Sequence, residues 1–134
     1  MDYKKSLEVL EELITNLKEE NEESPIIVEG DKDIEALRKL GLNGKIISIN
    51  KGVNLSDFSD RISHKFDNII ILTDWDRRGG YICRTIAKNL QGRVKINIKY
   101  RELFAKNTTI KTVEGLPSWI ETINKKLDKN CVSG

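Results

Sequence analysis

Apolar residues recur along the chain at two spacings, which predict helices that alternate with short strands. Leucines and isoleucines three and four positions apart predict amphipathic helices, whereas short continuous apolar runs predict buried strands. The predicted helices span residues 3–20, 34–40, 56–65, 77–91 and 116–127, and Pro117 lies near the first turn of the last one. The predicted strands span residues 26–28, 45–49, 68–73 and 94–98, and the run NIIILT at 68–73 is apolar enough for a central strand.

This order of elements predicts an α/β fold with a central four-stranded parallel sheet and helices on both faces, of the Rossmann-like kind. The 134 residues fit a single domain. In such sheets the ligand site lies beyond the carboxyl ends of the strands, where the strand order reverses. The residues that follow the first and third strands are therefore the first candidates for function.

Charge is distributed unevenly, although the formal net charge is only +2. Residues 1–23 hold eight acidic residues against three lysines, and residues 77–101 hold eight basic residues and no acid. A basic segment near clustered acids is typical of a metal-dependent phosphodiester site, although a solvated surface gives the same pattern. The acidic helix over residues 3–20 either covers one face of the sheet or binds a protein partner.

Several classes of protein are disfavoured by what the sequence lacks. No apolar run approaches the roughly 20 residues of a membrane span, and the acidic start does not resemble a secretory signal, so we expect no membrane partner. Cys83 and Cys131 lie far apart and have no histidine cluster, which predicts a cytoplasmic protein without a zinc site. Because His64 is the only histidine, carboxylates are the best candidates for catalysis.

Carboxylates follow both strands of interest, in the segments VEGDKD (28–33) and TDWDRRGG (73–80). If the first and third strands are neighbours, Glu29, Asp74 and Asp76 meet at one edge of the sheet, and such hard oxygen ligands suit Mg²⁺ or Mn²⁺. Trp75 is expected to point away into packing. Simpler roles remain open: Asp31 and Asp33 are expected to cap the helix that follows them, and Asp74 and Asp76 could form a turn and cap before residues 77–91.

Together the two segments resemble the motifs of the Toprim domain, the catalytic module of topoisomerases, bacterial-type primases and some nucleases. IIVEGDKD matches the Glu-Gly motif at the end of the first strand, and ILTDWDRRGG matches the Asp-x-Asp motif after the third. The resemblance covers about residues 24–100, leaving an acidic helix at about 3–20 and a C-terminal helical extension at about 101–130. It is strongest to small stand-alone archaeal Toprim proteins, which share Asp74–Gly79 and Val113–Ser118. Trp75 replaces a frequent proline, which alters packing and not the ligands.

The resemblance implies a role for each matching residue. Asp74 and Asp76 would bind Mg²⁺ (or Mn²⁺), and Glu29 would act as general acid or base or as a further metal ligand. Arg77, Arg84 and Lys88 fall on one face of the predicted helix 77–91. We expect them, with Arg78 and Lys32, to bind the phosphate backbone. The alternative is that Arg77 and Arg78 only form ion pairs with Asp74 and Asp76 or with the acidic helix.

The function that this pattern favours is Mg²⁺-dependent action on nucleic-acid phosphodiesters, as a hydrolytic nuclease or in RNA processing, with RNA favoured over DNA by family analogy. The alternative is a non-catalytic RNA- or protein-binding Toprim module within a larger complex. A nucleotide-binding regulator is a third reading, but the chain contains neither a G-x-G-x-x-G nor a Walker motif.

Overall fold

The computed structural model describes residues 1–132, and for residues 130–132 it describes the backbone alone. Helices and strands alternate through the first two-thirds of the chain, and two helices follow the last strand. In chain order the elements are α1 (Tyr3–Asn21), β1 (Ile26–Val28), α2 (Asp31–Lys39), β2 (Ile46–Ser48), α3 (Leu55–Lys65), β3 (Asn68–Ile71), α4 (Arg77–Leu90), β4 (Lys95–Asn97), α5 (Lys99–Asn107) and α6 (Leu116–Val132).

The four strands form one parallel sheet in the order β2-β1-β3-β4, which confirms the predicted fold class. β1 and β3 are direct neighbours, with Ile26 opposite Ile70 and Ile27 opposite Ile71. The strand order reverses at this pair, because the chain adds β2 on one side of β1 and β3 on the other. The carboxyl ends of β1 and β3 therefore form the switch point at which α/β sheets bind ligands.

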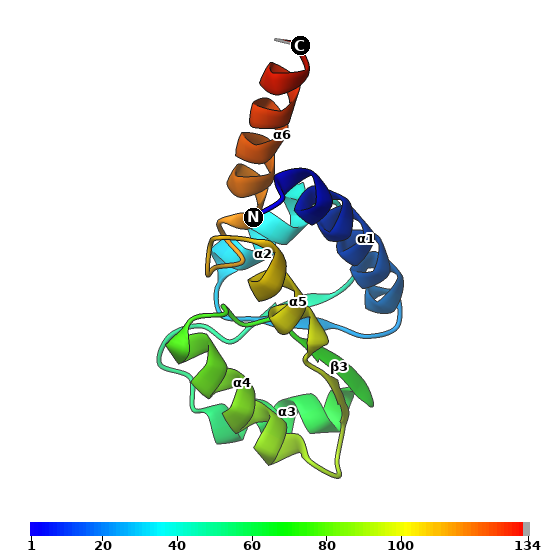
Figure 1. The fold of residues 1–134 in the computed structure, drawn as a ribbon. Coiled ribbons are helices and arrows are strands. Elements are labelled where there is room, and N and C mark those ends of the chain that lie inside the picture. The colour runs from blue at the N-terminus through cyan, green and yellow to red at the C-terminus, as the bar shows by residue number, and fades with distance from the viewer. Residues whose placement is uncertain (133–134) are drawn as a thin grey trace.

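Alternate residues of the central strands point to opposite faces of the sheet and build two separate cores. Ile26 and Ile70 pack with α1, α5 and α6 on one face, whereas Ile27 and Ile71 pack with α3 and α4 on the other. Figure 1 shows α3 and α4 beneath the sheet and the remaining helices above it. Both faces of β1 and β3 are covered, which explains why these strands are apolar at nearly every position.

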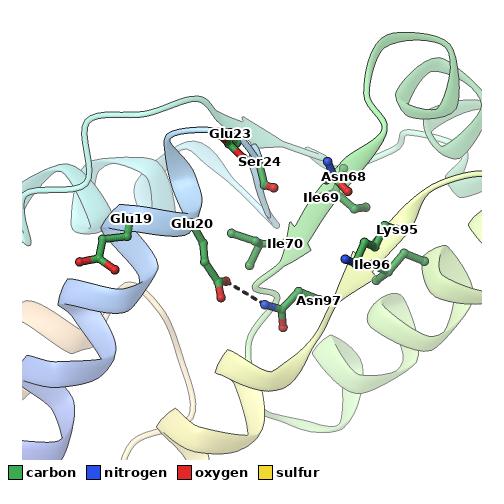
Figure 2. Close-up of a pocket in the computed structure, with 10 residues that line it drawn as sticks. All are labelled: Glu19, Glu20, Glu23, Ser24, Asn68, Ile69, Ile70, Lys95, Ile96 and Asn97. Atoms are coloured by element: carbon green, nitrogen blue, oxygen red, sulfur yellow. Dashed lines mark hydrogen bonds between the residues drawn. The ribbon is translucent and has the colours of Figure 1, made fainter.

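The acidic helix α1 covers one face of the sheet. Its inward side is a row of buried leucines at helical spacing, namely Leu7, Leu10, Leu13 and Leu17. Near its end, the Glu20 carboxylate accepts hydrogen bonds from Asn97 Nδ2 at 2.8 Å and from Lys99 Nζ at 3.1 Å. Figure 2 shows the first of these contacts across a shallow hollow between α1, β3 and β4. The hollow lies away from the carboxyl ends of β1 and β3, and its paired groups hold α1 against β4.

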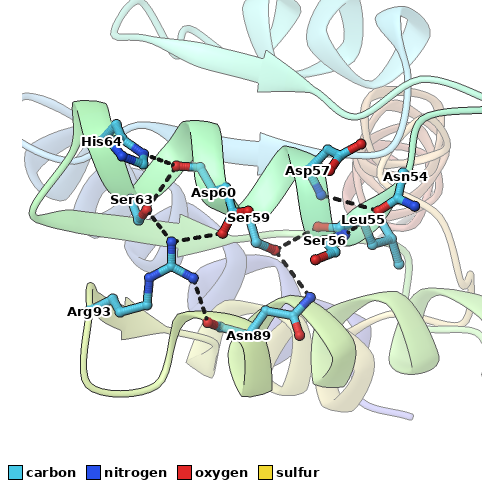
Figure 3. A network of polar contacts seen from close by, with 10 residues as sticks. All are labelled: Asn54, Leu55, Ser56, Asp57, Ser59, Asp60, Ser63, His64, Asn89 and Arg93. Carbon is cyan, nitrogen blue, oxygen red and sulfur yellow. Dashed lines mark hydrogen bonds and ion pairs between the residues drawn. The ribbon is translucent and has the colours of Figure 1, made fainter.

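Polar contacts on the opposite face join α3 to α4 (Figure 3). The Arg93 guanidinium, just after α4, binds Asp60 Oδ1 at 2.8 Å and Ser63 Oγ at 2.6 Å. Asn89 Nδ2 donates to Ser59 Oγ at 3.4 Å. His64 is exposed on α3, and its Nδ1 lies 2.6 Å from the backbone oxygen of Asp60. Arg93, one of the basic residues in 77–101, therefore helps to join α3 to α4.

Helix α5 was not predicted as an element of its own. Only Tyr100 and Phe104 are fully buried in its nine residues, so its periodic signal is too short to separate it from the C-terminal extension. Cys83 is a buried free thiol of α4, whereas the side chain of Cys131 lies outside the described part of the chain. Among the helices of residues 1–132, none combines the length and apolar character that crossing a membrane requires.

Candidate functional site

The two acidic motifs meet at the carboxyl ends of β1 and β3. Glu29 directly follows β1, and its Oε2 accepts a hydrogen bond from the backbone N–H of Asp74 at 2.8 Å across 45 residues of sequence. The pairing of β1 with β3 continues beyond the strands, since Leu72 N–H donates to Ile27 O at 2.8 Å. The topology thus places Glu29 and Asp74 side by side at the switch point.

Asp76 has a structural task in the same loop. It is the N-cap of α4, and its Oδ1 accepts a hydrogen bond from Gly79 N–H at 2.7 Å. Its charge nevertheless acts on Asp74, whose pKa it raises. Among the side chains that the structure describes, those of residues 1–129, no three from acidic residues, histidines or cysteines are arranged as a ready-made ligand set. The structure therefore pairs Glu29 with Asp74 and leaves Asp76 close by, with one oxygen used in the cap.

The pKa of the Asp74 carboxyl group is strongly perturbed. Burial raises its pKa to about 6, and the negative charges of Glu29 and Asp76 act in the same direction, while a hydrogen bond from Val113 N–H to Asp74 Oδ1 (2.9 Å) opposes the shift. Crowded negative charge is unfavourable until a cation neutralises it. The crowded carboxylates of Glu29, Asp74 and Asp76 therefore fit a hard divalent cation, which takes carboxylate oxygens as ligands.

Arg101 fixes the backbone around Asp74, although the sequence analysis included it only as one of the basic residues in 77–101. The Arg101 guanidinium of α5 donates to Thr73 O at 3.1 Å and to Asp74 O at 2.8 Å. Gly79 packs on the same carbonyl so closely that an added Cβ would lie 1.8 Å from Asp74 O. A glycine is therefore required at the third position of α4, where the helix backbone lies against the Asp74 carbonyl.

Trp75 points away from the carboxylates, as predicted, and joins the site to the C-terminal part of the chain. Its ring stacks on Phe104 with centroids 5.7 Å apart. Its Nε1 donates to Ile110 O at 2.6 Å, and its backbone N–H donates to Lys111 O at 2.9 Å. The segment between α5 and α6 is thereby held against the Asp74 loop.

A cleft of about 300 Å³ opens beside Glu29 and Asp74. Its charged lining residues are Glu29, Asp31, Asp33, Asp74 and Glu114 together with Lys32, Lys51 and Arg78. Carboxylates outnumber cations, so the interior attracts positive charge, while three basic side chains are available to a bound phosphate. Lys51 was not singled out from the sequence, and Glu114 appeared only as part of the shared stretch Val113–Ser118, because only the fold brings their loops to this edge.

Asp31 and Asp33 have structural partners. Asp33 is buried, and its Oδ2 accepts from Gly30 N–H at 3.1 Å in a capping interaction at the start of α2. Burial raises the pKa of Asp33, and the charges of Asp74 and Glu114 add to the shift. Asp31 accepts a hydrogen bond from Ser48 Oγ at 2.9 Å. Asp33 thus caps α2 from its third position, whereas Asp31 contacts β2 and makes no capping hydrogen bond.

The five basic residues predicted to bind phosphate separate into two groups. Arg78 and Lys32 line the cleft, whereas Arg77, Arg84 and Lys88 are exposed and lie outside its lining. In the part of the chain that the structure describes, ion pairs join Arg93 to Asp60, Lys99 to Glu20 and Lys125 to Glu121, and none involves these five. Arg77 and Arg78 also open α4, whose first turn contains no acid, although helix starts favour negative charge.

Fold and site together define a Rossmann-like α/β protein with paired acids at the switch point and a basic rim. The Toprim domain model matches residues 24–112, and the chain belongs to the Toprim family.

Small archaeal proteins resemble the chain over most of its length. It is 40% identical to a UPF0292 protein of Methanocaldococcus jannaschii, covering 93% of this chain and 94% of that protein. It is 37% identical to a UPF0292 protein of Thermoplasma volcanium, over 81% of this chain and 92% of that protein. A solved structure of a protein from Aquifex aeolicus superposes with a TM-score of 0.68 at 27% identity, covering 78% of this chain and 95% of that one. The expected resemblance to stand-alone archaeal Toprim proteins is confirmed.

Proposed function

We propose that this protein is a Mg²⁺-dependent hydrolase of nucleic-acid phosphodiester bonds, with RNA favoured over DNA and Mn²⁺ able to substitute. The observation that carries the proposal is the contact between Glu29 and Asp74 at the switch point, beside a cleft that Arg78 and Lys32 also line. Acids for a cation and bases for a phosphate in one cleft suit metal-assisted phosphoryl transfer. A cytoplasmic location, expected from the cysteines, belongs to the same proposal.

Asp74, Asp76 and Glu29 are the residues that would hold the cation. Asp74 Oδ1 accepts from Val113 N–H, Asp76 Oδ1 from Gly79 N–H and Glu29 Oε2 from Asp74 N–H, so each carboxylate has a second oxygen that makes no backbone hydrogen bond. Bound Mg²⁺ supplies charge neutralisation at the scissile phosphate. The backbone hydrogen bonds fix the carboxylates before any ligand arrives, which lowers the cost of forming the site.

The remaining roles follow from position in the cleft. Glu29, half-buried at the end of β1, would accept the proton of the attacking water or donate one to the leaving oxygen. Arg78 and Lys32 would hold the substrate phosphate against the acids. Asp33 stays a structural residue, because its carboxylate is committed to Gly30 N–H.

The decisive experiment measures Mn²⁺ and Mg²⁺ binding by calorimetry, and cleavage of single-stranded RNA, duplex RNA and the matching DNAs. We expect the parent protein to bind the metal and cleave a polymer, and Asp74→Asn to lose both while its circular dichroism is unchanged. Glu29→Gln should keep the fold and lose cleavage. Glu8→Gln removes an exposed acid of α1 and serves as the matched control.

If Asp74→Asn cleaves as well as the parent, the assigned role of the metal is wrong. If the parent binds metal and RNA but does not cleave, the protein is the non-catalytic binding module. Two observations favour this second reading: Asp76 uses an oxygen to cap α4, and no three-residue ligand set is preformed among the described residues.

A further inference from the structure

A third hollow, of about 340 Å³, runs along the edge strand β2 and helix α3. Its cations are Lys45, Arg61 and Lys65, and its apolar floor includes Ile47, Phe58 and Phe66. We refer to these six residues as the basic groove. No acidic residue lines the hollow, although α3 itself contains Asp57 and Asp60. Asp60 instead pairs with Arg93 on the α4 side of the helix.

The basic groove adjoins the candidate site. Ile49 and Asn50, the residues just after β2, line both this hollow and the cleft beside Glu29 and Asp74. Asn50 N–H donates to Glu29 O at 2.9 Å, and Ile49 N–H donates to Val28 O at 2.9 Å. The wall shared by the two hollows is therefore bonded to the backbone of the proposed catalytic residue. A chain lying in the groove would lead directly into the cleft.

Two cations of the groove are held over aromatic rings. Lys45 Nζ lies 5.4 Å from the centroid of Phe66, and the Arg61 guanidinium carbon lies 5.9 Å from that of Phe58. Phe66 remains half-buried, and Lys45, Arg61 and Lys65 are all exposed. Phe58 is buried beneath Arg61, so Phe66 and Ile47 are the parts of the floor that a ligand can reach. Positive charges beside a partly exposed aromatic ring are the features with which proteins bind single-stranded nucleic acid, through phosphates and base stacking.

We propose that the basic groove binds one strand of the nucleic-acid substrate and guides its backbone past Asn50 to Glu29 and Asp74. This inference rests on the proposed function, because it names the path of that function's substrate. It differs from the path expected from the sequence, which ran along Arg84 and Lys88 of α4. A single strand fits better than a duplex, since the apolar floor can contact only bases that are not paired.

The test measures the affinity for a fluorescent oligouridine by anisotropy, in EDTA and over a range of salt concentrations. The variant replaces Lys45, Arg61 and Lys65 by glutamine. For single strands each phosphate contact contributes about 0.7 to the slope of log K against log salt, so we expect the slope to become shallower by about two. The matched control replaces Lys4, Lys106 and Lys125, exposed lysines outside the groove, and should keep the parent slope.

The single variant Lys65→Gln tests the groove with little risk to the fold, because no cation–ring contact is lost. We expect this variant to reduce the slope by about 0.7. Unchanged slopes in both groove variants would overturn the inference, and a slope lost instead in the pair Arg84→Gln and Lys88→Gln would move the strand to α4. Metal binding separates the two proposals: groove variants should bind Mn²⁺ as the parent does, whereas Asp74→Asn should lose Mn²⁺ and keep the salt slope. A parent that binds no oligonucleotide would overturn both.

Discussion

At the scale of single residues, Asp74 shows how the site differs from an ordinary helix cap. Its backbone N–H donates a hydrogen bond to Glu29, its Oδ1 accepts one from Val113 N–H, and its carbonyl oxygen accepts one from Arg101. A carboxylate with so many fixed neighbours cannot turn away from other acids. The charge repulsion that results is a cost to the folded state, and it is the kind of cost that functional sites retain.

Replacing Asp74 by asparagine should therefore stabilise the protein at neutral pH. Burial and the charges of Glu29 and Asp76 raise the pKa of Asp74 to about 6, against about 3.9 for an unfolded aspartate. The folded state thus binds the proton more tightly, and this contribution to stability, full below about pH 4, is lost as the pH rises through 6. Thermal unfolding should show a higher Tm for Asp74→Asn at pH 7.5, by a few degrees.

The same measurement at pH 4 is the internal control for this prediction, because position 74 is then essentially uncharged in both folded proteins and their Tm values should come close together. Asp128→Asn, which removes an exposed acid of α6, should show no such pH-dependent difference. An Asp74→Asn protein that is less stable than the parent at pH 7.5 would show that the carboxylate is a net stabilising group.

At the scale of elements, the segment between α5 and α6 completes the site. Val113 N–H of this segment donates to Asp74, and Glu114 lines the cleft. Trp75 holds the segment in place through hydrogen bonds to Ile110 O and Lys111 O. The sequence shows these residues nearly 40 positions from the Asp-x-Asp motif, and no local pattern connects them. Their contact depends on α5, which turns the chain back after β4.

Trp75→Phe tests this connection. The substitution removes the hydrogen bond to Ile110 O and preserves most of the stacking on Phe104, so it should cost about 1 kcal/mol of unfolding free energy. We expect faster amide exchange at Val113 and weaker Mn²⁺ binding, since the segment that holds Asp74 Oδ1 is loosened. Urea unfolding, hydrogen exchange and calorimetry measure the three effects. Unchanged protection at Val113 would show that the tryptophan only fills space.

At the scale of the whole molecule, α1 packs on one face of the sheet and buries it. Leu10 and Leu17 are fully buried against the core that contains Ile26 and Ile70, so the fold depends on a helix that precedes the family match at residues 24–112. Most of the acids of α1 remain exposed on its outer side. A protein partner for that acidic surface stays a prediction.

Leu10→Ala should destabilise the protein by about 3 kcal/mol, because it leaves a cavity between α1 and the sheet. Glu8→Gln, two residues away on the exposed side, should change stability by less than about 0.5 kcal/mol. Urea unfolding compares the two variants with the parent. Equal stability of Leu10→Ala and the parent would mean that α1 is not part of the cooperative core.

The sequence by itself determined the order of the elements apart from α5, the parallel sheet and the two acidic motifs, because these depend on local periodicity and on residues close together in the chain. It also indicated the packing of Trp75 and the capping by Asp33. Only the tertiary structure decided that α1 covers the sheet, that Arg101 fixes Asp74, that Glu114 faces the cleft and that a basic groove follows β2. These features join segments far apart in sequence, and their contacts arise from the packing of helices on both faces of one sheet.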